Sequence, residues 1–173
     1  MANFKEDLSR VKAFIFDIDG VLSLQTIILN SFGVPNRTVN LRDGYALQLA
    51  VKKGYKIGVI SGSNSKEYQK RLKLLGIKDI YLNSRSKLAH FNNFLEKYNL
   101  NKSDVLFMGD DIPDIEVMRE VGIPVCPSDA ASEIKQVASY ISDKKGGEGC
   151  VRDVIEQVLR LNDNWMDSDA FIW

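Results

Sequence analysis

Two aspartates stand directly after a short apolar run near the start of the chain. Residues 13–16 are apolar without interruption, and Asp17-Ile-Asp-Gly20 follows. A continuous run of this kind is typical of a strand buried on both faces of a parallel sheet. Ligands of open α/β sheets bind at the carboxyl ends of the strands, so Asp17 and Asp19 are candidates for a catalytic or metal site. An Asp-Gly turn would explain Asp19 alone and leave Asp17 unexplained.

Polar side chains also follow the other predicted strands. Ser61 follows the strand at 55–60, and Lys87 lies near the start of a helix after a short strand at 80–82. Because the ends of parallel strands share one edge of a sheet, we expect these residues to meet the first aspartate pair in one pocket. The strand at 105–108 adds three further acids to the same edge, Asp110, Asp111 and Asp114.

A pocket with this many carboxylates needs a cation. Two carboxylates about 4 Å apart repel each other by roughly 4 kcal/mol at an effective dielectric constant near 20. The predicted pocket contains one lysine and neither His nor Cys. Hard oxygen ligands favour Mg²⁺ over zinc or copper, so the sequence predicts a magnesium site.

Strand and helix patterns alternate along the chain. This alternation predicts a three-layer α/β/α fold with a Rossmann-like, mostly parallel central sheet. We expect a single domain over residues 1–173, with a projecting β-hairpin flap at about 23–39 and a C-terminal tail at about 162–173. Residues 40–44 are predicted to form a polar turn in which Asp43 caps a helix through 45–53. Further helices are predicted at 65–75, 84–98, 113–121 and 130–137, and a last one ends near Leu161.

The overall charge argues against several classes of partner. The 23 basic and 23 acidic side chains cancel, and no long run of one sign occurs, so neither nucleic acid nor a membrane is expected as a partner. No signal peptide and no spanning segment is apparent. Cys126 and Cys150 match no metal-binding or disulfide pattern, which favours a reducing, cytoplasmic location.

The haloacid dehalogenase superfamily has four sequence motifs, and this chain resembles them in order and spacing at residues 17–21, Ser61, Lys87 and residues 109–114. The resemblance implies that Asp17 is the nucleophile that becomes an aspartyl phosphate. It implies that Asp19 protonates the departing alcohol and later deprotonates water, and that Ser61 and Lys87 hold phosphate oxygens. The dehalogenase branch lacks the second acid, so Asp19 favours a phosphatase.

The same resemblance implies a set of metal ligands. Asp17, the backbone carbonyl of Asp19, and Asp110 would bind Mg²⁺. Asp111 and Asp114 would act as outer partners that orient ligands and waters.

The spacing between the motifs leaves no room for a cap domain. Only 41 residues separate Asp19 from Ser61, and 25 separate Ser61 from Lys87, whereas domains seldom fall below about 50 residues. Something else must cover the pocket, and a neighbouring subunit is the obvious candidate.

The hairpin, the segment at 40–44, Arg71, and Gly146-Gly-Glu-Gly149 followed by Arg152 resemble a narrower family, the 3-deoxy-D-manno-octulosonate 8-phosphate phosphatases of lipopolysaccharide precursor synthesis. The resemblance implies a homotetramer in which the subunits cover one another's sites. We expect the segment after Tyr140 to serve the sugar and to be dispensable for the Mg²⁺ site. A phosphorylated sugar acid would contact Asp19, Asn40, Leu41, Arg42, Asp43, Gly44, Arg71 and Lys87.

Two positions depart from this family. Many members have arginine where this chain has Gln48 and Ser63, so Arg42, Arg85 or Arg152 would have to supply the charge. The alternatives are a phosphatase for the nine-carbon 2-keto-3-deoxy-nononate 9-phosphate and a non-catalytic assembly or regulatory domain of a sugar-activating system. A generic phosphate-ester assay and a comparison of the two sugar phosphates separate these three.

Overall fold

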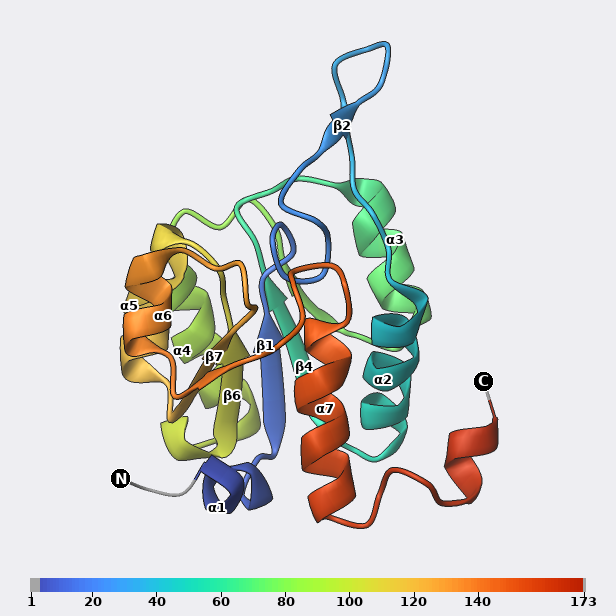
Figure 1. Ribbon diagram of the computed structural model, residues 1–173, viewed down its shortest axis with the longest axis vertical. Coiled ribbons are helices and arrows are strands. Elements are labelled where there is room, and N and C mark those ends of the chain that lie inside the picture. The colour runs from blue at the N-terminus through green and yellow to red at the C-terminus, as the bar shows by residue number, and fades with distance from the viewer. Residues whose placement is uncertain (1–3, 173) are drawn as a thin grey trace.

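A parallel sheet forms the middle layer of the computed structural model, which describes residues 4–172 (Figure 1). Both ends of the predicted domain, residues 1–3 and 173, lie outside that range. The six strands are ordered β5-β4-β1-β6-β7-β8, and all neighbouring pairs are parallel. They are β1 (Ala13–Phe16), β4 (Lys56–Ile60), β5 (Asp79–Tyr81), β6 (Val105–Met108), β7 (Ile123–Cys126) and β8 (Tyr140–Ile141).

Helices cover both faces of the sheet. One face packs against α1 (Phe4–Ser9), α2 (Leu41–Lys52), α3 (Lys66–Leu74) and α7 (Cys150–Leu161). The other packs against α4 (Lys87–Tyr98), α5 (Ile115–Glu120) and α6 (Ser132–Val137). Three short 3₁₀ turns complete the elements: η1 (Lys102–Asp104), η2 (Ile112–Asp114) and η3 (Ser168–Phe171). The predicted three-layer α/β/α fold is confirmed. No helix within 4–172 is both long and apolar enough to cross a membrane.

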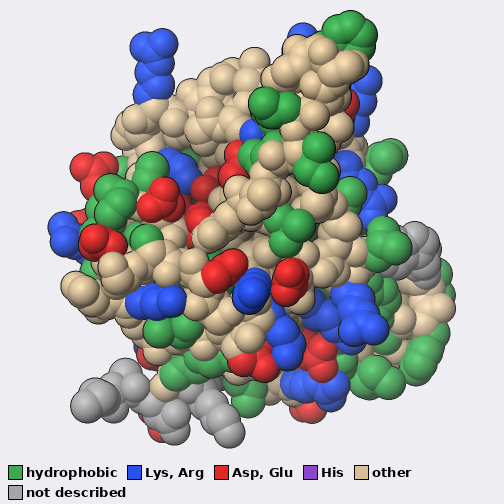
Figure 2. Space-filling view, turned by 45° about the horizontal axis from the view of Figure 1, so that its top comes forward, with side chains coloured by type: hydrophobic (Ala, Val, Ile, Leu, Met, Phe, Trp, Pro, Cys, Tyr) green, Lys and Arg blue, Asp and Glu red, His purple; other side chains and the backbone are tan. Residues whose placement is uncertain are grey.

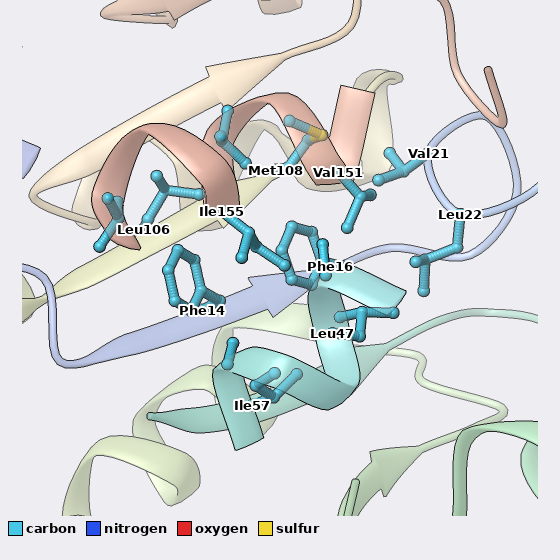
Figure 3. Packing of buried hydrophobic residues seen from close by; sticks show 14 of the residues in the cluster. Phe14, Phe16, Val21, Leu22, Leu47, Ile57, Leu106, Met108, Val151 and Ile155 are labelled. Carbon is cyan, nitrogen blue, oxygen red and sulfur yellow. The ribbon is translucent and has the colours of Figure 1, made fainter. Parts of the chain in front are cut away.

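Strand β1 is buried on both faces, as its unbroken apolar run predicts. Phe14 and Phe16 face the α2 and α7 side, where Figure 3 shows them close to Leu47, Val151 and Ile155. The alternate residues, Ala13 and Ile15, belong to the cluster on the opposite side. Truncating a buried Phe to Ala typically costs about 3–5 kcal/mol, so this packing holds β1, and the aspartates that follow it, firmly in place.

The hairpin projects from one end of the sheet (Figure 1). Its strands, β2 (Ile28–Leu29) and β3 (Pro35–Asn36), are antiparallel and pair only with each other in the described chain. We call residues 23–39 the hairpin arm. Large apolar side chains on the arm are exposed, including Ile28 at 73% and Phe32 at 88%. An arm of this kind has no core of its own and little to pack against within one subunit.

Helix α2 starts earlier than predicted. The side chain of Asn40 accepts hydrogen bonds from the backbone N–H groups of Arg42 and Asp43, so Asn40 is the N-cap and residues 41–44 form the first turn. The prediction that residues 40–44 form a polar turn in which Asp43 caps the helix is therefore wrong. Asp43 instead accepts a hydrogen bond from the backbone N–H of Arg152 at 2.7 Å, a contact between distant segments that local sequence does not reveal.

The other differences are small. Strand β5 begins and ends one residue earlier than predicted, and Pro113 lies in η2 instead of opening a continuous helix. The sequence analysis missed α1 and η3, which are short and carry no clear periodicity.

The segment after Tyr140 belongs to the core. Val151, Val154 and Ile155 of α7 are fully buried against the sheet, so we expect their removal to destabilise the fold strongly. This burial argues against the expectation that the whole segment is dispensable for the metal site. The part after α7 also packs on the protein: Trp165 is buried in the core cluster, and Lys53, the C-cap of α2, forms ion pairs with Asp167 and Asp169.

Candidate active site

One cavity of about 1110 Å³ lies at the carboxyl ends of β1, β4 and β6. Figure 2 shows acidic side chains gathered in a hollow beside the base of the hairpin arm. Parallel strands deliver their following loops to one edge, which explains how distant residues meet here. The lining includes seven residues that the sequence analysis selected: Asp17, Asp19, Ser61, Lys87, Asp110, Asp111 and Asp114.

Three aspartates form the floor of the cavity. Asp17, Asp110 and Asp114 are all buried, and one carboxylate oxygen from each lies within 4.8 Å of the others. We call these three residues the carboxylate cluster. Lys87 Nζ lies 2.8 Å from Asp17 Oδ2 and 2.6 Å from Asp114 Oδ1. With all groups charged, three carboxylates and one ammonium leave an excess of negative charge that a divalent cation would neutralise.

The pKa values reflect this excess. Burial, together with the charge of Asp114, raises the pKa of Asp17 to about 6, although Lys87 opposes the shift. Burial and the charges of Asp17 and Asp114 raise the pKa of Asp110 to about 7. For Lys87, burial alone would lower the pKa, but the two neighbouring carboxylates outweigh it and raise the pKa. The cluster therefore holds protons readily when no metal neutralises it.

The donor set fits a hard divalent cation. All nearby ligand atoms are oxygens, which is the chemistry that Mg²⁺ prefers. The backbone after Asp19 also approaches the cluster, because a Cβ added to Gly20 would lie 1.9 Å from Asp110 Oδ2. Gly20 has φ +79°, a conformation that residues with a side chain adopt rarely. This close approach places the backbone of the loop after β1 beside Asp110.

Asp114 is already occupied by partners within the protein. Its Oδ1 accepts from Lys87, and its Oδ2 accepts from the backbone N–H groups of Asp110 at 3.1 Å and Asp111 at 3.4 Å. Asp111 caps η2, accepting from the N–H of Ile112 at 2.8 Å, and its side chain is exposed. Asp114 therefore orients the loop that carries Asp110.

Ser61 and Lys87 each lie at the end or start of an element. Ser61 follows β4, is 2% exposed, and its Oγ accepts from the N–H of Ser63 at 3.2 Å. Lys87 is the first residue of α4, whose N-cap is Ser86. Both residues line the cavity and supply it with a cation and a hydroxyl group.

Among the lining residues that the sequence analysis did not select, three form polar contacts that shape the site. Arg37 of the hairpin arm forms a bidentate ion pair with Asp19, with distances of 2.7 Å to Oδ1 and 2.9 Å to Oδ2. Gln25 donates to Asp110 Oδ2 at 3.2 Å, and Asp129 accepts from the N–H of Gly146 at 2.9 Å. Arg37 is the only arginine of the predicted flap, and that was the signal available to find it.

Several of the predicted substrate contacts lie elsewhere. Asn40, Asp43, Gly44 and Arg71 line a second, much smaller pocket and not the large cavity. Leu41 and Arg42 line neither pocket, and both are exposed.

Ser63 and Gln48, the two positions that depart from the family pattern, lie in different environments. Ser63 lines the large cavity, whereas Gln48 lines neither pocket. Of the arginines considered as substitutes, Arg85 lines the cavity, whereas Arg152 lies over the ring of Trp165, 5.0 Å from its centroid.

Comparisons with known proteins agree on one family. A family model described as haloacid dehalogenase-like hydrolase matches residues 75–155. The 3-deoxy-D-manno-octulosonate 8-phosphate phosphatase of Escherichia coli (strain K12) is 34% identical over 149 residues, which cover 86% of this chain and 79% of that protein.

Solved structures give the same result. The phosphatase of that name from Moraxella catarrhalis, crystallised with a magnesium ion, a phosphate ion and KDO, is 32% identical with a TM-score of 0.90 and covers 99% of this chain and 97% of its own. The enzyme from Yersinia pestis is 29% identical with a TM-score of 0.90, over 93% and 87% of the two chains. The chain therefore belongs to the family of 3-deoxy-D-manno-octulosonate 8-phosphate phosphatases, which are phosphoric monoester hydrolases of the haloacid dehalogenase superfamily.

Proposed function

We propose that this protein is a Mg²⁺-dependent phosphatase that hydrolyses 3-deoxy-D-manno-octulosonate 8-phosphate to the free sugar acid and phosphate, in lipopolysaccharide precursor synthesis. The observation that carries the proposal is the buried carboxylate cluster bridged by Lys87, in a chain that is 34% identical to a phosphatase of that name. A cluster of this kind has a large cost in a non-catalytic module, because buried like charges destabilise the fold.

The proposed reaction has two steps. Asp17 attacks phosphorus, the bond from phosphorus to the sugar oxygen breaks, and Asp19 donates a proton to that oxygen. Asp19 then takes a proton from the attacking water, the aspartyl phosphate is hydrolysed, and Asp17 is regenerated. Ser61 and Lys87 hold the phosphate oxygens during both steps.

The metal has a supporting role in this scheme. Asp17, the carbonyl of Asp19, and Asp110 would hold Mg²⁺, which neutralises the charge of an anionic nucleophile approaching an anionic phosphate. Asp114 and Asp111 would act behind these ligands. Asp114 would fix the Asp110 loop and Lys87, and Asp111 would cap the following turn.

We also propose a cytoplasmic homotetramer. The free, buried thiols of Cys126 and Cys150 suit a reducing compartment, and the exposed apolar side chains of the hairpin arm suit a subunit interface. Asn40 to Gly44 and Arg71 remain candidates for substrate contact through such an assembly, since they lie outside the cavity of their own subunit.

The deciding experiment measures phosphate release from the eight-carbon and the nine-carbon sugar phosphates, with Mg²⁺ and with a chelator. We expect Mg²⁺-dependent turnover with a higher kcat/KM for the eight-carbon substrate. A preference for the nine-carbon compound would transfer the proposal to 2-keto-3-deoxy-nononate 9-phosphate. No release from either compound or from a generic phosphate ester would support a non-catalytic assembly domain.

A further inference from the structure

Asp19 is held by an arginine from the hairpin arm. Arg37 Nε donates to Asp19 Oδ1 at 2.7 Å, and Arg37 Nη2 donates to Oδ2 at 2.9 Å. The Arg37 side chain is only 9% exposed, whereas that of Asp19 is 34% exposed. A bidentate pair of this geometry is among the stronger polar contacts in proteins.

The backbone around Arg37 is fixed to the loop that follows Asp19. The N–H of Thr38 donates to Ser23 Oγ at 3.0 Å, and the N–H of Leu24 donates to Thr38 Oγ1 at 3.0 Å. These two contacts tie the two sides of the arm together at its base. Arg37 is therefore positioned at the cavity wall and does not depend on the exposed tip of the arm.

This ion pair conflicts with the proposed role of Asp19. Both of its carboxylate oxygens accept hydrogen bonds from Arg37, and an arginine cannot give up its proton in a protein. To protonate a leaving oxygen, Asp19 must carry a proton on one oxygen and direct it at the substrate. The two bonds to Arg37 hold the carboxyl group in one orientation, so it can turn toward the substrate only when at least one of them breaks.

Breaking the pair alone would leave a buried guanidinium without an anion, which is costly. A second anion must therefore take the place of Asp19. The phosphate is an unsuitable candidate, because Lys87 and Ser61 lie where the nucleophile Asp17 needs it. A sugar acid carries a second anion, its carboxylate, which matches the planar fork of arginine.

We propose that Arg37 binds the carboxylate of the sugar-acid substrate and, by exchanging Asp19 for it, frees Asp19 for proton transfer. This inference rests on the proposed function. In the exchange one carboxylate replaces another on the guanidinium, and no covalent bond changes. The freed carboxyl group of Asp19 can then turn toward the sugar oxygen that leaves phosphorus. Arg37 thereby supplies a positive charge at the cavity wall.

The test compares two substrates that differ in one charge: 3-deoxy-D-manno-octulosonate 8-phosphate and its carboxamide. For Arg37→Gln we expect kcat/KM to fall about 30- to 100-fold with the acid, the loss typical of a charged hydrogen-bonded pair, and less than tenfold with the amide. Arg37→Lys, which keeps the charge but loses the fork, should give an intermediate loss with the acid. Arg119→Gln, an exposed arginine on α5 outside the cavity, is the matched control.

Equal losses with the two substrates would overturn the proposal and leave Arg37 as a residue that only orients Asp19. Loss of the acid preference in Arg85→Gln instead of Arg37→Gln would also overturn it, because Arg85 is the other arginine that lines the cavity. A binding readout independent of turnover uses Asp17→Asn titrated with the free sugar acid, whose affinity should fall when Arg37→Gln is added. Failure of the proposed function would look different, since the parent protein would then release no phosphate from the acid in Mg²⁺.

Discussion

The carboxylate cluster and the hairpin arm both border the cavity, but they are built in opposite ways. The cluster is buried, contacts Lys87 directly, and follows strands packed on both faces. The arm carries exposed apolar side chains, and its two strands pair only with each other within the described chain (Figure 2). The cluster is therefore held in place by buried packing, whereas the arm has exposed apolar surface and one arginine, Arg37, at the cavity wall.

The largest expected effect breaks the cluster at its nucleophile. Asp17→Asn should reduce turnover by roughly 10⁴-fold or more, because an amide is a poor nucleophile. It is also a weaker ligand for Mg²⁺. Phosphate release is the measurement, and an unchanged circular dichroism spectrum is the control for folding. Activity within tenfold of the parent protein would rule out the proposed nucleophile.

The next prediction tests the residue where the two regions meet. Asp19→Asn should slow the reaction by about 10²–10⁴-fold, the usual contribution of general acid and base catalysis. The loss should be larger for an alkyl phosphate, whose leaving group needs a proton, than for p-nitrophenyl phosphate. A parent-like rate with the alkyl phosphate would reduce Asp19 to a turn residue.

The third prediction concerns Gly20, in the loop after β1. It separates the effect of a collision with Asp110 from the effect of placing a side chain at a positive φ. Gly20→Ala and Gly54→Ala both place a side chain at a positive φ, +79° and +86° respectively. Only the Cβ at position 20 would collide with Asp110, since nothing lies within 4 Å of the one at position 54. We expect Mg²⁺ affinity to fall roughly 10- to 100-fold in Gly20→Ala, as for residues that orient metal ligands. Calorimetric titration should show parent-like affinity in Gly54→Ala, and equal losses would contradict the role of this close approach.

The fourth prediction uses the pH dependence of the cluster. The pKa values of Asp17 and Asp110, about 6 and about 7, lie above the ordinary value of 3.8. Their protonation therefore stabilises the metal-free fold below the ordinary value, and this stabilisation is lost as the pH rises through 6 to 7. Protons also compete with Mg²⁺ for the same oxygens.

We accordingly expect Mg²⁺ to raise the unfolding temperature more at about pH 8 than at about pH 5. Thermal unfolding with and without Mg²⁺ at both pH values measures this. Asp110→Asn should reduce the difference between them. An equal rise at the two pH values would show that the cluster does not bind the metal.

The smallest effect on chemistry is expected at the tip of the arm. Replacing Ile28 and Phe32 together with serine should lower the mass in solution from that of a tetramer. It should change the free energy of unfolding of a subunit by no more than about 0.5 kcal/mol, as for other exposed positions. Light scattering provides the mass, and Leu74→Ser, at an apolar position that is 80% exposed on α3, is the matched control. A monomer mass for the active parent protein would refute the assembly.

The sequence by itself determined the fold class and the location of the cavity. Apolar runs ending in acids or hydroxyls identify parallel strands and their carboxyl ends, and this signal is local. Asp17 and Ser61 directly follow strands, Asp110 follows one after a single glycine, and Lys87 opens a helix. Their meeting therefore follows from the topology.

Only the tertiary structure decided which residues lie against one another across segments. The pairing of Arg37 with Asp19 depends on how the arm folds back at its base, and hairpin sequence does not specify that angle. The position of Asp43 depends on the N–H of Arg152, which is 109 residues away. Side-chain partners of this kind are set by packing between distant elements, and packing leaves no periodic pattern in the sequence.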